Sequence, residues 1–94
     1  MIRSFGDGWT RSVFQRVRVK SFSAELQRSA LRKLEILNAA TTLNDLRIPP
    51  GNRLEKLAGN RQGQYSIRIN DQFRVCFVWK EGNAYSVEIA DYHF

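Results

Sequence analysis

With 94 residues, 43% of them hydrophobic and 12% aromatic, the chain can form one domain with a modest core and does not have the composition of a disordered protein. The single cysteine, Cys76, excludes an intramolecular disulfide, and with one histidine in the chain no metal site is expected. A net charge of +6 favours a polyanionic partner, while short apolar runs and the lack of a signal peptide indicate a cytoplasmic protein rather than a membrane protein.

The first third of the chain is predicted to contain a short strand and a helix. Residues 2–5 form the strand candidate, which a Gly-Asp-Gly turn ends. Residues 10–19 are predicted to form the helix, because apolar residues recur on one side of it: Trp9, Val13, Phe14 and Val17.

A second helix is predicted to begin after Ser23, whose hydroxyl can cap it, and to run to about residue 40. Its buried stripe consists of residues at helical spacing, namely Leu26, Ala30, Leu34 and Leu37. Arg28, Arg32, Lys33 and Glu35 fall mostly on the other side, where we expect a solvated surface.

After the Pro-Pro-Gly sequence at 49–51, which cannot continue a helix, the apolar period changes to two. Strands are predicted at 53–57, 64–70, 73–79 and 84–92, with a loop at 58–63 and a turn at 81–83. In the last strand, Tyr85, Val87 and Ile89 occupy the apolar face. The pattern predicts an α+β fold over residues 1–94, with two N-terminal helices packed on one side of a small, mainly antiparallel sheet.

The hairpin formed by 64–70 and 73–79 has one register that pairs apolar residues with apolar residues. A three-residue loop, 70–72, pairs Ile67 with Val75 and places Arg68 directly opposite Arg74. Like charges in this position are destabilising. Either a phosphate between the two guanidinium groups relieves the repulsion, or the side chains diverge into water.

Three further basic residues, Arg53, Lys56 and Arg61, could extend an RNA-binding surface around the 53–57 strand and its loop. Each of them alone is more often a solvated surface charge. Cys76 alternates with core positions and has no histidine near it in sequence, so we interpret it as a packing residue rather than a nucleophile.

The C-terminal segment places three proton-handling side chains in a row, Asp91, Tyr92 and His93. Histidine is the usual general acid or base near neutral pH. A histidine beside two arginines suits metal-independent RNA cleavage, which must activate the ribose 2′-OH, stabilise charge on the phosphate and protonate the leaving 5′-oxygen. Strict alternation puts Asp91 and His93 on the apolar face. If all three are to meet one phosphate, the chain must bend after about Ala90 or the tail must curl around the sheet edge. The alternative is a frayed terminus with a solvated histidine.

Several segments together resemble the HigB-type toxins, plasmid maintenance killer proteins of the RelE/ParE superfamily. The resemblance extends over essentially the whole chain, and the segments that carry it are 1–5 (MIRSF), 50–55 (PGNRLE), 59–61 (GNR), 64–71 (QYSIRIND), 73–77 (FRVCF) and 87–93 (VEIADYH). The resemblance implies a RelE-like fold with element order β-α-α-β-β-β-β. It also implies a type II toxin–antitoxin system.

The activity that the resemblance implies is that of a ribosome-dependent mRNA endonuclease without metal or cofactor, which cleaves translated message in the 30S A site and inhibits translation. The implied partners are a HigA-type helix-turn-helix antitoxin, the ribosome and mRNA in the bacterial cytoplasm. The toxin alone would be monomeric and would form a hetero-oligomer with its antitoxin. Two other functions compete with this one: a gyrase-poisoning toxin of the same fold, and an RNA- or ribosome-binding module without chemistry.

The resemblance also implies site residues. The family's C-terminal Asp-Tyr-His corresponds to residues 91–93 and its sheet arginine to Arg74. Some relatives carry a histidine where this chain has Glu55 and a lysine where it has Ala58. Either Glu55 serves as the base, or Lys56, Arg53 and Arg68 carry more of the electrostatic work, or the chain is a weaker nuclease.

Overall fold

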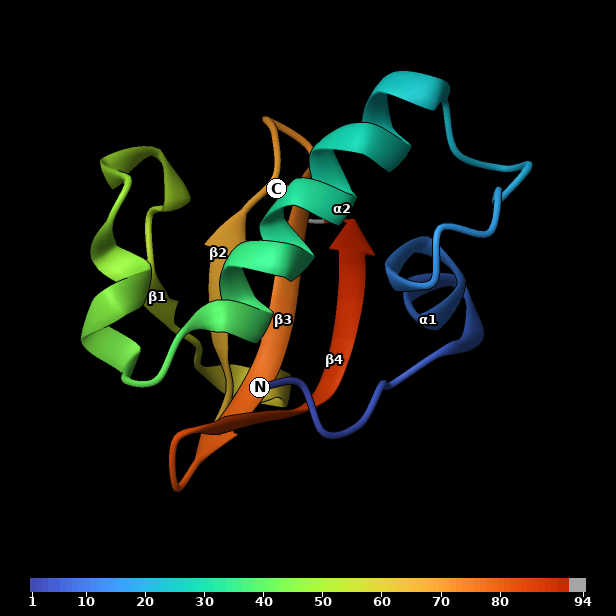
Figure 1. Ribbon diagram of the computed structural model, residues 1–94. Helices are drawn as coiled ribbons and strands as arrows, with labels where there is room; N and C mark the ends of the chain where they lie inside the picture. Colours follow the sequence, from blue (N-terminus) through green and yellow to red (C-terminus); the bar gives the residue numbers. More distant parts are fainter. Residues whose placement is uncertain (92–94) are drawn as a thin grey trace.

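The computed structural model describes residues 1–91 and places two helices on one face of a four-stranded antiparallel sheet (Figure 1). The helices are α1 (Gly8–Phe14) and α2 (Ala24–Ala39). The strands are β1 (Glu55–Lys56), β2 (Tyr65–Arg68), β3 (Phe73–Lys80) and β4 (Asn83–Asp91), which lie side by side in chain order. Three short 3₁₀ helices connect them: η1 (Leu43–Arg47), η2 (Pro50–Asn52) and η3 (Gly59–Arg61). The predicted α+β class and the helices on one side are confirmed. Among residues 1–91, no helix is long and apolar enough to cross a membrane.

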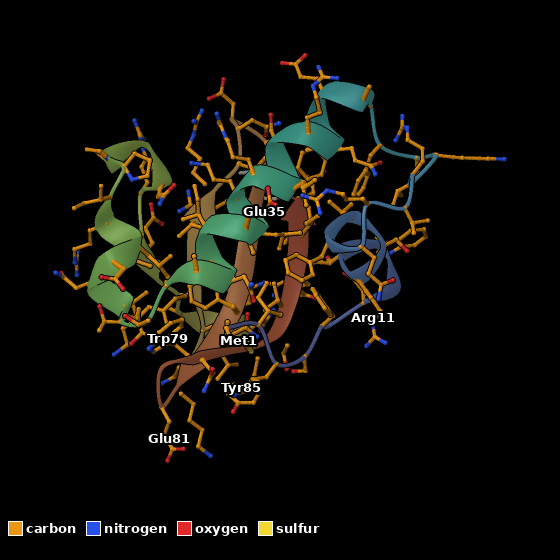
Figure 2. All side chains as sticks on the ribbon, viewed as in Figure 1. Met1, Arg11, Glu35, Trp79, Glu81 and Tyr85 are labelled. Carbon is orange, nitrogen blue, oxygen red and sulfur yellow. The ribbon has the colours of Figure 1, made fainter. Side chains whose placement is uncertain are left out.

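Helix α2 forms as its sequence predicts. The Ser23 hydroxyl caps it by accepting a 3.0 Å hydrogen bond from the Leu26 amide. The stripe of Leu26, Ala30, Leu34 and Leu37 is buried against the sheet, while Glu35 lies on the outer side (Figure 2). Lys33 was expected on that solvated side as well, and this prediction is wrong: it is only 6% exposed. Its amino group donates to the side chain of Asn52 in η2, which draws it into the interior.

Helix α1 is shorter than predicted. It begins after Asp7, whose carboxylate accepts from the Thr10 amide at 2.8 Å, and it ends at Phe14 because Arg16 adopts a left-handed backbone with φ of 62°. The helical spacing therefore does not continue to Val17, which is 53% exposed, and Trp9 in the first turn is 59% exposed. Of the four residues predicted on the apolar side, only Val13 is fully buried.

The N-terminal residues protect the outer edge of β4. The predicted strand at 2–5 is reduced to two isolated parallel bridges, Ile2 with Ala84 and Phe5 with Val87. Further along the edge, the Thr10 hydroxyl accepts a 2.8 Å hydrogen bond from the Ile89 amide. These contacts occupy edge groups that could otherwise pair with another chain.

A β-bulge in β4 changes which face its residues occupy. The pairing of β3 with β4 shifts between Cys76 and Val78, and Ser86 takes a left-handed φ of 52°. Before the bulge, Tyr85 pairs with Val78 on the face away from the helices, so its predicted place beside Val87 is wrong. Ala84 takes the helix-facing position and is fully buried. At the tip of this hairpin (Figure 2), Glu81 and Gly82 both have positive φ, as a type I′ turn requires.

Candidate functional site

The sheet face that points away from α1 and α2, here called the far face, carries two rows of paired residues. The predicted hairpin register is confirmed. Ile67 lies opposite Val75 on the helix-facing side, and Arg68 lies opposite Arg74 on the far face. Strand β4 adds Ala90 beside Arg74. The next row on the same face consists of Glu55, Ser66, Cys76 and Glu88. The register thus brings both predicted arginines and Glu55 onto one surface.

Arg74 is held in place from two directions. Its Nε donates to the hydroxyl of Ser66 at 2.7 Å, and its Nη2 donates to the backbone carbonyl of Arg53, also at 2.7 Å. The Glu55 carboxylate lies 3.7 Å from Nη2. Within residues 1–91 no hydrogen bond is found at Nη1, which leaves that edge of the guanidinium to bind an anion. The side chain is 12% exposed, so it reaches solvent but cannot move far.

Arg68 is held more loosely. Its guanidinium pairs with Asp71 in the hairpin loop, whose side chain is fully exposed. Each arginine of the opposed pair therefore has a carboxylate of its own, and the fold does not need a phosphate to relieve their repulsion. An exposed pair such as Arg68–Asp71 contributes about 0–1 kcal/mol. A phosphate can displace Asp71 at little cost.

The two residues of β1 point to opposite faces. Glu55 pairs with Ser66 on the far face, whereas Lys56 pairs with Tyr65 and projects to the other side. The predicted strand at 53–57 is shortened because Arg53 adopts a left-handed backbone, with φ of 44° and ψ of 60°. The structure therefore joins Glu55 to the arginine pair and separates Lys56 from it. Arg53 is exposed, and its backbone carbonyl contacts Arg74.

Arg61 lies on the far face but is engaged by the protein itself. In η3, its guanidinium binds Gln64 at 3.2 Å and forms an ion pair with Glu88 of β4. Both side chains are partly buried, at 32% and 26% exposure, so this pair fastens the 59–64 segment to the sheet. Cys76 is buried in the same row, and this burial raises the pKa of its thiol. The interpretation of Cys76 as a neutral packing residue is supported.

Asp91 is the last residue that the structure describes. It pairs with Phe73, and its carboxylate accepts a 3.0 Å hydrogen bond from the side chain of Gln72. Because Phe73 faces the helices, Asp91 lies on the opposite face of the sheet from Arg74. The bend expected after Ala90 is not found at Asp91, which continues the strand. Tyr92 and His93 lie outside the described residues, and their roles stay predictions.

A buried polar pair behind the site was missed by sequence reasoning. Asn52 is fully buried; its amide oxygen accepts from the Lys33 amino group at 2.5 Å, and its nitrogen donates to the carbonyls of Leu46 and Ile48 at 3.2 and 3.3 Å. Burial lowers the pKa of Lys33, and the charges of Arg32 and Arg68 lower it further. The available signal was spacing: position 33 is three residues after Ala30 and four before Leu37, on the edge of the buried stripe.

A surface hollow among the described residues lies away from the far-face cluster. It has a volume of about 570 Å³ and is lined by Gly8, Trp9, Ser12, Arg18, Val19 and Lys20, none of them a predicted site residue. In residues 1–91 no group of three or more His, Cys, Asp or Glu side chains could hold a metal ion. The predicted site residues that the far face does bring together are Arg68, Arg74 and Glu55.

Comparison with known proteins identifies similar chains. The family described as "RelE-like toxin of type II toxin-antitoxin system HigB" matches residues 3–93. Toxin HigB-1 of Vibrio cholerae serotype O1 is 44% identical over 85 residues, which cover 89% of this chain and 90% of the relative. Endoribonuclease HigB of Proteus vulgaris is 28% identical over 97 residues, covering 99% and 100%. A chain of the heterotetrameric YoeB–YefM toxin–antitoxin complex from Staphylococcus aureus has the same fold, with a TM-score of 0.62 and 16% identity over 100% of this chain and 99% of that one.

Proposed function

The chain belongs to the HigB-like family of RelE-like toxins of type II toxin–antitoxin systems, and from this premise we propose that it is a ribosome-dependent endoribonuclease that cuts translated mRNA. The observation that carries the proposal is the cluster of Arg74, Arg68 and Glu55 on the far face. Two arginines and a carboxylate on one exposed surface supply phosphate binding and proton transfer without a metal. The relative named Endoribonuclease HigB supports the same activity.

In the proposed reaction the ribose 2′-oxygen attacks phosphorus and the bond to the leaving 5′-oxygen breaks. Arg74 and Arg68 bind the phosphate and stabilise the negative charge that builds on its oxygens. Arg74 suits this task because Ser66 and the Arg53 carbonyl already fix its guanidinium. Glu55 accepts the 2′-OH proton, or His93 does so in its place.

The C-terminal residues complete the proposed site. His93 acts as the general acid that protonates the 5′-oxygen when Glu55 is the base. Asp91 orients His93 or contacts the ribose, and Tyr92 stacks a base of the message. Asp91 starts from the helix-facing side of β4. The reaction therefore requires His93 to reach the far face from that starting point.

Basic side chains outside the cluster are proposed to contact RNA along the backbone. Arg53 is exposed and its backbone contacts Arg74, and Lys56 would contact a neighbouring part of the message from the other side of β1. Arg61 contributes positive charge while it stays paired with Glu88. We assign these residues to affinity rather than to chemistry.

Toxins of this class work with an antitoxin, and solved relatives of the same fold are toxin–antitoxin complexes. We assign this chain an antitoxin of the HigA type with a helix-turn-helix domain, with which it forms a hetero-oligomer. The ribosomal A site and its message are the proposed target. This places the toxin in the bacterial cytoplasm, where translation occurs.

The test uses purified translating ribosomes with a defined message, and primer extension to locate cuts. The protein should cut the message only when it is being translated, and His93→Ala should remove the cuts while leaving the fold intact. Arg28→Ala, at an exposed position on α2, is the control for a change away from the site. Full activity of His93→Ala would overturn the catalytic assignment. An uncut message with arrested translation would indicate a binding module, and gyrase cleavage in a parallel supercoiling assay would indicate a gyrase poison.

A further inference from the structure

The turn that carries Arg53 is fixed from inside the protein. Asn52, which precedes Arg53, holds the segment between α2 and β1 by donating to the carbonyls of Leu46 and Ile48. Its amide oxygen accepts a hydrogen bond from the amino group of Lys33, a residue of α2. Both side chains are buried, with Lys33 at 6% exposure and Asn52 at 0%. A buried amide with its acceptor and its donors all bonded is a rigid anchor.

This anchor connects directly to the site. The residue after Asn52 takes a left-handed backbone, and its carbonyl accepts the 2.7 Å bond from Nη2 of Arg74. The other anchor of Arg74, Ser66, belongs to the sheet and is positioned by the strand pairing. The carbonyl of Arg53 comes from irregular backbone, so its position depends on how firmly the 50–53 turn is held.

We propose that Lys33 and Asn52 form a positioning pair that sets the orientation of the Arg74 guanidinium by fixing the Arg53 carbonyl. The proposal rests on the proposed function insofar as Arg74 binds the scissile phosphate. Neither Lys33 nor Asn52 touches RNA in this assignment. They act through the turn, and Lys33 is therefore a positioning residue rather than a catalytic one.

The charge of Lys33 is a second link to the site. The charge of Arg68 lowers the pKa of Lys33, because the two cations repel each other. A buried cation behind two surface arginines adds to the positive potential where a phosphate would bind. A neutral residue that merely filled space at position 33 would supply neither this potential nor the bond to Asn52.

The experiment replaces Lys33 with methionine, which keeps an unbranched apolar chain and removes the amino group. Cleavage is measured in single turnover with excess toxin on stalled ribosome complexes. The expected result is a loss of up to about 100-fold in the maximal rate, as a small misplacement of a catalytic group produces, with little change in the half-saturating toxin concentration. Leu26→Ala, a core change elsewhere on α2, controls for lost stability and should keep the maximal rate.

A double-mutant cycle shows whether Lys33 acts through Arg74. If it does, Lys33→Met should slow the Arg74→Lys variant by a much smaller factor than it slows the parent protein. Independent, multiplicative losses would overturn the proposal. So would a Lys33→Met variant with the full maximal rate.

A measurement on the protein without RNA tests the positioning pair independently of the proposed nuclease activity. The bond to the Arg53 carbonyl restricts rotation about the Nε–Cζ bond of Arg74, which NMR of the ¹⁵N-labelled side chain detects. Lys33→Met should speed this rotation, and Leu26→Ala should not. Faster rotation in a protein that never cuts message would support the positioning pair and refute the nuclease. Unchanged rotation would refute the pair whatever the activity.

Discussion

Replacement of Arg74 by lysine keeps the positive charge and removes the fork of nitrogens. In the structure, Nε and Nη2 of Arg74 bind different acceptors, the Ser66 hydroxyl and the Arg53 carbonyl, each at 2.7 Å. The single nitrogen of lysine cannot occupy both positions. At least one of the two hydrogen bonds must therefore be lost.

The decrease in the free energy of unfolding depends on which of the two acceptors loses its hydrogen-bond donor. Ser66 is fully buried, so an unpaired hydroxyl there lowers the free energy of unfolding by about 1–3 kcal/mol. Arg53 is exposed, so water can replace a donor to its carbonyl. Since domains of this kind are stable by about 5–15 kcal/mol, the variant should still fold. Cleavage should fall by about 10²–10³, because the phosphate loses a preorganised donor.

Both quantities are measurable on the same protein. Urea unfolding gives the change in stability at constant m, and primer extension on translating ribosomes gives the cleavage rate. Arg68→Lys is the matched control, because its pair with Asp71 is exposed and should change stability by less than about 1 kcal/mol. Equal stability of the two variants would refute the role of the Ser66 bond. Full cleavage by Arg74→Lys would refute phosphate binding by the guanidinium fork.

Three other predictions concern residues outside the site. Cys76, buried and with a raised pKa, should react with a thiol reagent only when the protein unfolds; native-state reaction as fast as in urea would contradict its burial. The backbone amides of Thr41 and Thr42 donate to Asp45 and lower its pKa below the ordinary 3.8, so this carboxylate stabilises the fold above that pH and ceases to do so as the pH falls through the lowered value. Asp45→Asn should therefore be less stable than the parent at pH 7 in urea unfolding, with a difference that vanishes in acid; a difference that persists there would contradict the assignment. Ser86→Gly should raise the free energy of unfolding by about 0.5 kcal/mol, because glycine relieves the left-handed backbone at some cost in chain entropy, and a loss of stability in urea would refute this.

The sequence by itself determined the features that repeat with a local period. Helix α2 has the predicted capping residue and buried stripe, because side chains three and four residues apart share a helix face. The β2–β3 register, with Arg68 opposite Arg74, follows from alternation along each strand and the length of the loop between them. The family and its fold class were recognised from segments spread along the chain, and comparison confirms both.

The tertiary structure alone decided which residues meet across long separations. The bulge at Ser86 moves Tyr85 to the far face, and no local pattern marks it because a single left-handed residue shifts the alternation of the strand. Arg61 meets Glu88 from 27 positions away, and Lys33 reaches Asn52 from 19. Periodicity predicts the face on which a side chain lies, whereas its partner depends on how the elements pack. The sequence could therefore nominate Arg74, but only the fold shows what holds it in position.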